Sequence, residues 1–335
     1  MKRQNEISFE KAVQQLFLKD NILILTHANP DGDCIGSACA MYLMLKKVGK
    51  RVKIACPSEI PKRLEFILEG IECEDVIQTS ESLIKSGYGF DSAVSVDVAS
   101  DTLLGDMLTL VEGKISLAFD HHQTNTICAQ GVYVLPSASA TGEIMYELLL
   151  KAQQEYKLDF IKIAANAIYA SIASDTGCFC YSNTTAKTHL YASKLIESGA
   201  QASQINHRLF EIKTQKQFHA EKIAMDNMQT FFGGKLVISY ITKKQLEEIE
   251  AQSSDADTCV QTIKMIEGCQ AAAFIKEKEQ NQYKVSLRTT EAVDAAYACK
   301  QLGGGGHIRA AGCTVEDTLE NTIDIIKKVI QQQLQ

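Results

Sequence analysis

Acidic and histidine side chains stand in four short motifs along the first half of the sequence. They are the segment His27–Asp33, which contains Asp31, then Asp97, the triplet Asp120-His121-His122, and Asp175. Imidazole nitrogens and carboxylate oxygens together suit Mn²⁺, with Mg²⁺, Co²⁺ or Fe²⁺ as alternatives. Two adjacent ions held by such groups promote in-line hydrolysis of phosphate esters. The motifs therefore predict one two-metal site for phosphoryl chemistry.

Three of the motifs directly follow stretches that are typical of buried β-strands, at residues 21–25, 92–96 and 114–119. Residues 172–174, which precede Asp175, fit the end of a helix better. In an open parallel sheet, side chains just past the carboxyl ends of the strands converge on one crevice. We therefore expect motifs that are distant in sequence to become neighbours there.

Each motif taken alone also has a plain structural interpretation. Asp-Gly is a common turn signal, so the segment His27–Asp33 by itself would more often be an ordinary loop than a metal site. A carboxylate after a strand often caps the next helix, and we favour that role for Asp101. A capping role for Asp97 does not explain why the next strand also ends in Asp120-His121-His122. The metal interpretation accounts for all the motifs together.

The distribution of apolar residues predicts an α/β protein of two domains. Residues 1–185 alternate strand-like and helical patterns, as in a parallel sheet covered by helices. Residues 186–230 read as a helical connector, with helices at 185–197, 201–210 and 214–228. Residues 231–335 form a smaller α/β domain, with strands at 235–241, 270–275 and 283–287 and helices at 258–267 and 291–301.

Composition limits the classes of function. The chain has 335 residues, of which 45% are hydrophobic and 22% charged, as in a soluble protein with two separate cores. We expect no membrane association and a cytoplasmic location, because no apolar run approaches the roughly 18 residues of a membrane span. The eleven cysteines are expected to be reduced thiols. The net charge of −7 argues against long duplex nucleic acid as a partner but permits a small anionic substrate.

A glycine-rich element in the second half adds candidate phosphate-binding groups. It runs through Gly303, Gly304, Gly305 and Gly306 to His307, followed by Arg309. Glycines let backbone N–H groups approach an anion closely, and His and Arg supply directional donors. A flexible loop is the commoner meaning of a glycine run, and a solvated helix residue is the alternative for Arg309. Arg288, at the end of a predicted strand, is a further candidate for the same anion or for a stacked base.

The motifs in this order resemble the DHH phosphoesterase family, whose name describes the triplet Asp120-His121-His122. The residues 303–312 resemble the substrate-binding domain associated with that family, so the resemblance covers nearly the whole chain. Within the family the sequence is most similar to the NrnA type, bifunctional nanoRNases that also dephosphorylate 3′-phosphoadenosine 5′-phosphate (pAp). No ligand position of the family pattern is missing.

The resemblance implies a role for each motif residue. His27 and Asp31 would bind one metal ion, and Asp33, His121 and Asp175 the other, with Asp97 bridging the two. Asp120 would orient the metal ligands from behind, and His122 would contact the phosphate and assist the leaving oxygen as a general acid. The substrate-binding group would comprise His122, Arg288, Gly304, Gly305, Gly306, His307 and Arg309.

The resemblance also implies the reaction and the substrates. We expect hydrolysis of short RNA oligonucleotides to nucleoside 5′-monophosphates and of pAp to AMP, with two divalent ions, Mn²⁺ being favoured. Alternatives are hydrolysis of a cyclic dinucleotide or of its linear product pApA, and pyrophosphatase activity, which the glycine element disfavours. An alternative that is not an enzyme is a nucleotide-binding regulator with a catalytically inactive site, and the intact set of metal ligands argues against it. The oligomeric state is left open, a homodimer being one option.

Overall fold

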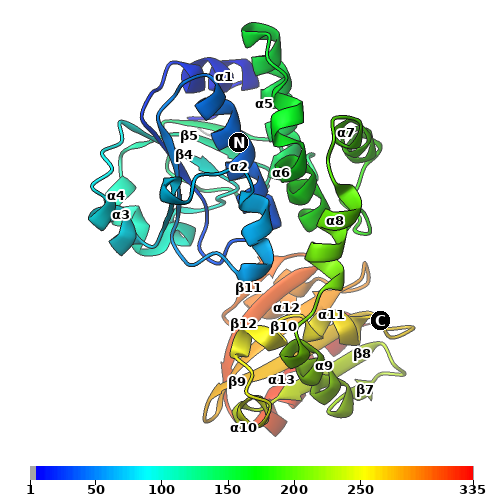
Figure 1. Cartoon of the computed structure of the whole chain (residues 1–335). Helices are drawn as coiled ribbons and strands as arrows, with labels where there is room; N and C mark the ends of the chain where they lie inside the picture. Colours follow the sequence, from blue (N-terminus) through cyan, green and yellow to red (C-terminus); the bar gives the residue numbers. More distant parts are fainter. Residues whose placement is uncertain (1–4, 335) are drawn as a thin grey trace. The chain divides into compact units, whose positions relative to one another are not determined.

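A computed structural model of the chain describes residues 5–334, and of His307 it describes the backbone only. The chain divides into two compact units, Met1–Ile212 and Lys213–Gln335. Each unit is built on its own six-stranded sheet (Figure 1). The prediction of an α/β protein with a parallel sheet in its first half is confirmed.

Six parallel strands form the sheet of the first unit, in the order β3-β2-β1-β4-β5-β6. They are β1 (Ile22–Leu25), β2 (Val52–Cys56), β3 (Val76–Gln78), β4 (Ser92–Val96), β5 (Ile115–Asp120) and β6 (Gly131–Val134). From β1 the chain builds outward through β2 and β3 and then returns to the other side of β1 to form β4. The strand order reverses there, and ligands bind at the carboxyl ends of strands at such a point.

Helices cover both faces of this sheet because its strand side chains alternate between two cores. Ile22, Ile24, Val94 and Val96 belong to the core that also contains apolar side chains of four helices. These are α1 (Phe9–Phe17), α2 (Gly32–Lys47), α5 (Thr141–Tyr156) and α6 (Phe160–Asp175). The opposite core contains side chains of α3 (Ser80–Ser86), the 3-10 helix Asp101–Met107 and α4 (Leu108–Val111). Two further 3-10 helices, Lys62–Leu68 and Cys73–Asp75, lie between β2 and β3.

The strands and helices predicted around the motifs lie within two residues of the observed ones. The helix expected to end before Asp175 is α6, which includes that residue as its last. Asp101 does not cap a helix, because it is the first residue of the 3-10 helix, whose cap position is Ser100, and its Oδ1 instead accepts a hydrogen bond from the Cys128 N–H (2.9 Å). The capping interpretation of Asp101 is therefore wrong.

The predicted connector region contains three helices that fall in different units. α7 (Ala186–Glu197) and α8 (Ala202–Asn206) pack against α6 in the first unit, whereas α9 (Gln215–Asp226) lies in the second. The helix expected at 201–210 is shorter, and it continues as a π-helical turn, His207–Glu211. Whether residues 186–230 act as a connector stays a prediction.

The second unit contains a mixed sheet in the order β11-β12-β10-β9-β8-β7. Its strands are β7 (Gln229–Phe231), β8 (Leu236–Ile241), β9 (Ala271–Glu279), β10 (Gln282–Thr289), β11 (Gly305–His307) and β12 (Ala310–Glu316). Among the described strands of this second sheet, only the β8–β9 pair is parallel. One core holds α12 (Ala295–Lys300) and α13 (Leu319–Gln331), and the other holds α9, α10 (Lys243–Glu248) and α11 (Cys259–Lys264).

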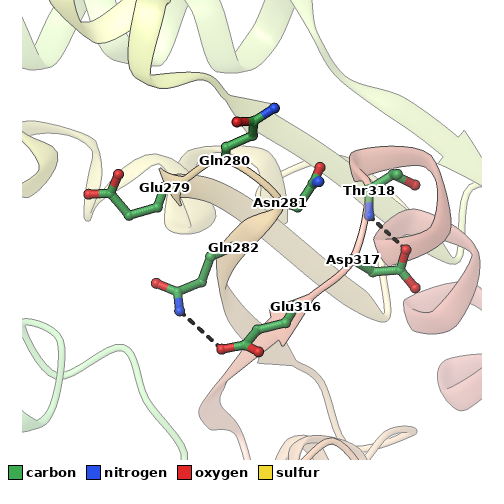
Figure 2. A pocket seen from close by; sticks show the side chains of 7 residues that line it. All are labelled: Glu279, Gln280, Asn281, Gln282, Glu316, Asp317 and Thr318. Carbon is green, nitrogen blue, oxygen red and sulfur yellow. Dashed lines mark hydrogen bonds between the residues drawn. The ribbon is translucent and has the colours of Figure 1, made fainter.

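A polar hollow of about 500 Å³ lies where the β9–β10 hairpin approaches the end of β12 (Figure 2). Gln282 donates to the Glu316 carboxylate (3.2 Å), and the Thr318 N–H donates to Asp317 Oδ1 (2.7 Å). None of the predicted site residues lines this hollow.

The structure bears on two expectations drawn from composition. Within residues 5–334, no helix is both long and apolar enough to cross a membrane. All eleven cysteines are free thiols, as expected.

Candidate metal centre

The loop after β1 and the first turn of α2 present His27, Asp31 and Asp33. Asp31 caps α2, its Oδ1 accepting the Cys34 N–H (3.0 Å). His27 Nδ1 lies 3.0 Å from the Ala28 carbonyl oxygen, which fixes Nδ1 as the protonated nitrogen and leaves Nε2 to act as a ligand. That Nε2 lies 3.9 Å from Asp31 Oδ1 and 3.7 Å from Asp97 Oδ2.

Asp97 occupies the centre of the site, immediately after β4. Its N–H donates to the Phe119 carbonyl oxygen (2.9 Å), so the sheet holds its backbone. Its φ of 58° is in the left-handed region, which aspartate tolerates better than most residues. This conformation directs Oδ2 toward His27 and Oδ1 toward His121, whose Nε2 lies 3.7 Å from Oδ1.

His121 follows β5 and gathers a second group of carboxylates around its Nε2. Asp33 Oδ2 lies 3.8 Å from this nitrogen and Asp175 Oδ2 lies 3.6 Å from it. His121 Nδ1 lies 3.2 Å from the Ala138 carbonyl oxygen, so Nε2 is again the nitrogen available to an ion. Ligand atoms about 2.1 Å from one ion are roughly 3–4 Å apart, which matches both groups.

Asp120 lies behind the site and is fully buried. Its Oδ1 accepts hydrogen bonds from the His121 N–H (2.8 Å) and from His122 Nδ1 (2.7 Å). Its Oδ2 accepts a hydrogen bond from Asn125 Nδ2 (2.5 Å), which also donates to the Val98 carbonyl oxygen. Asp120 therefore orients both histidines of the triplet, and Asn125 fixes Asp120.

Four hydrogen bonds hold the Asp33 carboxylate, which is 1% exposed. Oδ1 accepts from the Ser171 hydroxyl (2.5 Å), the Ser37 hydroxyl (3.2 Å) and the Gly142 N–H (3.1 Å). Oδ2 accepts from the Thr141 N–H (2.8 Å) and faces His121. The hydrogen bonds to Oδ1 thus fix the carboxylate, and Oδ2 is the oxygen that faces the other ligands of the site.

Glycines bring the helices close enough for these bonds. A Cβ on Gly36 would lie 2.4 Å from the Ala167 carbonyl oxygen, and a Cβ on Gly32 would lie 2.6 Å from Ser174. A Cβ on Gly142 would lie only 1.9 Å from Ser171 Oγ. Small residues on α2 and α5 therefore allow Ser171 of α6 to reach Asp33.

Residues 138–142 contact His121, Asp33 and Asp97 from outside the site. The Thr141 hydroxyl donates to Asp97 Oδ1 (2.9 Å), and the Ala138 carbonyl oxygen faces His121. Asn183 Nδ2 donates to the carbonyl oxygens of Ser139 (2.9 Å) and Asp175 (3.1 Å), which ties this segment to the last ligand. The sequence prediction missed these positioning residues: Ser37, Asn125, Thr141, Ser171 and Asn183.

The electrostatics of the site show a shortage of positive charge. Burial, with the carboxylates of Asp97 and Asp175 adding to it, raises the pKa of Asp33 well above its usual range. Burial also raises the pKa of Asp175 to about 7, against the opposing effect of His121. Carboxylates that resist ionisation in this way are stabilised as anions by a cation placed among them.

The histidines compensate only part of that shortage. Burial alone would raise the pKa of Asp97, but the hydrogen bond with His27 and the charge of His121 outweigh it and lower that pKa to about 2. Burial would lower the pKa of His122, but Asp120 outweighs it and raises that pKa to about 9.

The donor set fits divalent metal ions. Within residues 5–334, three groups of side chains offer three ligand atoms within 4.8 Å of one another. They are His27, Cys34 and Asp97; Asp97, His121 and His122; and Asp33, His121 and Asp175. Every ligand predicted from the sequence except Asp31 belongs to one of them, and Asp31 faces His27 from the exposed side.

The predicted substrate-binding residues other than His122 lie in the second unit, described here by itself. Glycine is needed at 304 and 306 because a Cβ there would lie 2.2 Å from the Gly312 carbonyl oxygen and 2.6 Å from that of Ala310, respectively. Gly305 and Gly306 belong to the short strand β11, so the glycine run is not simply a flexible loop. The side chain of His307 lies outside what the structure describes.

The two arginines of this unit make local hydrogen bonds. Arg309 Nη1 donates to the carbonyl oxygens of Thr290 (2.6 Å) and Val293 (3.1 Å), so Arg309 is not a solvated helix residue. Arg288, inside β10, donates from Nη1 to the Leu287 carbonyl oxygen (3.0 Å). Anion binding by these residues stays a prediction.

Comparison with known proteins supports the same assignment. Residues 21–172 match the N-terminal domain of the DHH family, and residues 233–335 match the DHHA1 domain. A bifunctional oligoribonuclease and PAP phosphatase, NrnA, from Thermus thermophilus is 29% identical over 93% of this chain and 90% of its own length. Its namesake from Bacillus subtilis is 28% identical over 90% of this chain and 92% of its own length.

A solved structure shows the same fold. It is the crystal structure of an exopolyphosphatase-related protein from Bacteroides fragilis, 20% identical, which matches with a TM-score of 0.87 over 96% of each chain. DHH phosphoesterases are metal-dependent hydrolases, and the metal-binding donor set described above agrees with that class. With both domain models matched in order and relatives similar over nearly the full length, the chain belongs to the DHH family of phosphoesterases.

Proposed function

We propose that the protein hydrolyses RNA oligonucleotides of a few residues to nucleoside 5′-monophosphates and converts pAp to AMP, using two divalent metal ions, with Mn²⁺ favoured. The relatives that match over nearly their whole length carry names for both activities. The geometry of the first unit supports the metal requirement, and the net charge of −7 agrees with a short anionic substrate.

The position of Asp97 is the observation that carries the two-ion proposal. Its Oδ2 faces His27, which Asp31 also faces, whereas its Oδ1 faces the group around His121. One carboxylate with an oxygen toward each group is suited to bridge two adjacent ions. Two such ions, when bound, activate a water molecule and stabilise both the attacking and the leaving oxygen at phosphorus.

We assign the following roles to the residues of the site. His27, Asp31 and Asp97 would hold one ion, and Asp33, Asp97, His121 and Asp175 the other. His122 would donate a proton to the leaving oxygen, because Asp120 raises its pKa to about 9, which keeps the ring protonated at neutral pH, and orients the ring through Nδ1. Asp120 itself would act only by orienting His121 and His122.

The second unit would contribute substrate binding. Arg288, Arg309 and His307 would contact a phosphate or a base remote from the reacting phosphorus, and backbone N–H groups of Gly304, Gly305 and Gly306 would approach the same anion. Binding energy from such a remote group can serve to position the reacting phosphate.

A substrate panel tests the proposal. Purified protein with Mn²⁺ should cleave pAp and di- to pentanucleotides and leave a 24-mer largely intact; pApA is included because cyclic-dinucleotide chemistry is the alternative. Asp97→Asn and EDTA treatment should each reduce turnover to less than a tenth. Full activity after exhaustive EDTA treatment would refute the metal requirement, and tight binding of pAp without hydrolysis would indicate a regulator instead.

The contribution of the second unit needs a separate comparison. Arg309→Ala should lower kcat/KM for pApA by roughly ten- to a thousandfold, as expected for one or two charge-assisted hydrogen bonds. Hydrolysis of bis-p-nitrophenyl phosphate, which lacks the remote group, should change little. Because Arg309 also binds the carbonyl oxygens of Thr290 and Val293, Arg309→Lys and the melting temperature of each variant serve as controls. Equal losses on both substrates would contradict a substrate-binding role.

A further inference from the structure

Cys34 is a buried thiol beside the metal centre to which the proposed function gives no role. It is the third residue of α2, one position after Asp33, and it is 0% exposed. The same helix carries Cys39, equally buried, which belongs to none of the potential ligand groups among the described residues. Two thiols on one helix thus differ in their surroundings.

The Cys34 sulfur lies among ligand atoms of the first ion position. Cys34 Sγ, a ring nitrogen of His27 and a carboxylate oxygen of Asp97 all lie within 4.8 Å of one another. His27 Nε2 also has Asp31 Oδ1 at 3.9 Å and Asp97 Oδ2 at 3.7 Å. An ion at this position would therefore have nitrogen, oxygen and sulfur donors within reach.

The hydrogen bonds of the thiol are compatible with binding a metal. Cys34 Sγ accepts the His27 N–H (3.3 Å), an interaction that a thiolate ligand keeps and strengthens. Its S–H points at the Val96 carbonyl oxygen at a long 3.7 Å. Of these two hydrogen bonds, binding of an ion by the sulfur would give up only the one to Val96.

We propose that Cys34 is a sulfur ligand of the ion held by His27, Asp31 and Asp97. On binding, the S–H bond breaks, the sulfur keeps the electron pair and donates it to the ion, and the proton leaves to solvent. The inference rests on the proposed function in that it assumes an ion at the His27 position.

A sulfur ligand makes the two ion positions chemically unequal. Thiolate favours Zn²⁺, Co²⁺ and Fe²⁺ over Mn²⁺ and Mg²⁺, whereas the position around His121 offers only imidazole and carboxylate donors. We therefore expect the His27 position to select the softer ion when several metals are present and the His121 position to accept Mn²⁺ readily.

Titration of the metal-free full-length protein with Co²⁺ tests the sulfur bond directly. Cobalt bound to thiolate gives an intense near-ultraviolet charge-transfer band, whereas cobalt bound only to nitrogen and oxygen gives weak visible bands. The wild-type protein and Cys39→Ala should show the charge-transfer band, and Cys34→Ala should lose it. After equilibration with equal Zn²⁺ and Mn²⁺, Cys34→Ala should also retain a zinc-to-manganese ratio lower by about tenfold, in line with losing one ligand.

The outcomes separate this inference from the proposed function. Binding of cobalt by wild-type protein without a charge-transfer band would overturn the role of Cys34 and leave the two-ion proposal standing. A band that persists in Cys34→Ala would equally overturn it. Failure of wild-type protein to bind any cobalt would instead contradict the metal centre itself, and the inference with it. The wild-type spectrum alone decides if Cys34→Ala does not fold.

Discussion

The hydroxyl of Thr141 should control how tightly the site binds metal, although it touches no substrate or ion. It donates a 2.9 Å hydrogen bond to Asp97 Oδ1, the oxygen that faces His121. Both side chains are buried, at 0% and 2% exposure, so water cannot replace the bond. Thr141→Val keeps the shape and removes the donor, while the backbone N–H that binds Asp33 stays in place.

The size of the effect follows from the charge on the acceptor. A hydrogen bond to a buried charged group contributes about 1.5–3 kcal/mol. Since each 1.4 kcal/mol is a factor of ten in an equilibrium constant, Thr141→Val should weaken metal binding by about ten- to a hundredfold. Thr141→Ser retains the hydroxyl and should bind metal within about threefold of wild type, less than 1 kcal/mol.

The assay is calorimetric titration of each metal-free variant with Mn²⁺, alongside the Mn²⁺ dependence of pAp hydrolysis. At saturating Mn²⁺ much of the activity of Thr141→Val should return, because the ligands themselves are intact. Wild-type affinity in Thr141→Val, or an equal loss in Thr141→Ser, would refute the positioning role. Melting temperatures measured in EDTA separate this effect from a general loss of stability.

Two other perturbations test the packing and the electrostatics of the first unit. Gly142→Ala would place a Cβ 1.9 Å from Ser171 Oγ, so urea unfolding should show a free energy of unfolding lower by about 1–3 kcal/mol, together with weaker Mn²⁺ binding. Gly89→Ala is the control, because a Cβ there would meet nothing within 4 Å, and it should show neither effect. Burial alone would raise the pKa of Asp75, but the hydrogen bonds from Lys46 and Tyr42 and the charges of Lys46 and Lys53 together outweigh it and lower that pKa. The stabilisation by Asp75 is therefore present above pH 4 and is lost as the pH falls through its folded pKa. Asp75→Asn should therefore cost about 1–3 kcal/mol at pH 7, and the difference from wild type should shrink below pH 4; a difference independent of pH would contradict this.

The residues proposed as metal ligands could be singled out from the sequence because each has a local signal. His27, Asp97 and His121 each follow an apolar strand, and parallel topology then implies that strand ends meet. Asp175 at the end of a helix was the least supported by this argument, and the structure still places it 3.6 Å from His121. The periodicity of the apolar residues likewise predicted β1, β4 and β5 of the first sheet and β8, β9 and β10 of the second, whereas β3, β6, β7, β11 and β12 were not predicted.

The positioning residues could not be predicted because their partners are set by packing. Thr141 is 44 residues from Asp97, and Ser171 is 138 residues from Asp33. No spacing rule connects such pairs, since they meet only when α2, α5 and α6 pack together. Of the positioning residues that were missed, Asn125 could most easily have been predicted, because it stands five residues after Asp120 in the loop that follows the triplet.

The left-handed backbone at Asp97 means that no replacement keeps both the backbone conformation and the negative charge. Outside glycine, asparagine and aspartate adopt such a φ most readily, whereas glutamate, which would keep the charge, is disfavoured there. The replacements that the backbone accepts are therefore the ones that abolish the charge that we propose to bridge the two ions. A descendant that lost catalysis by Asp97→Asn would keep its fold and its other ligands, and its sequence would still look almost intact.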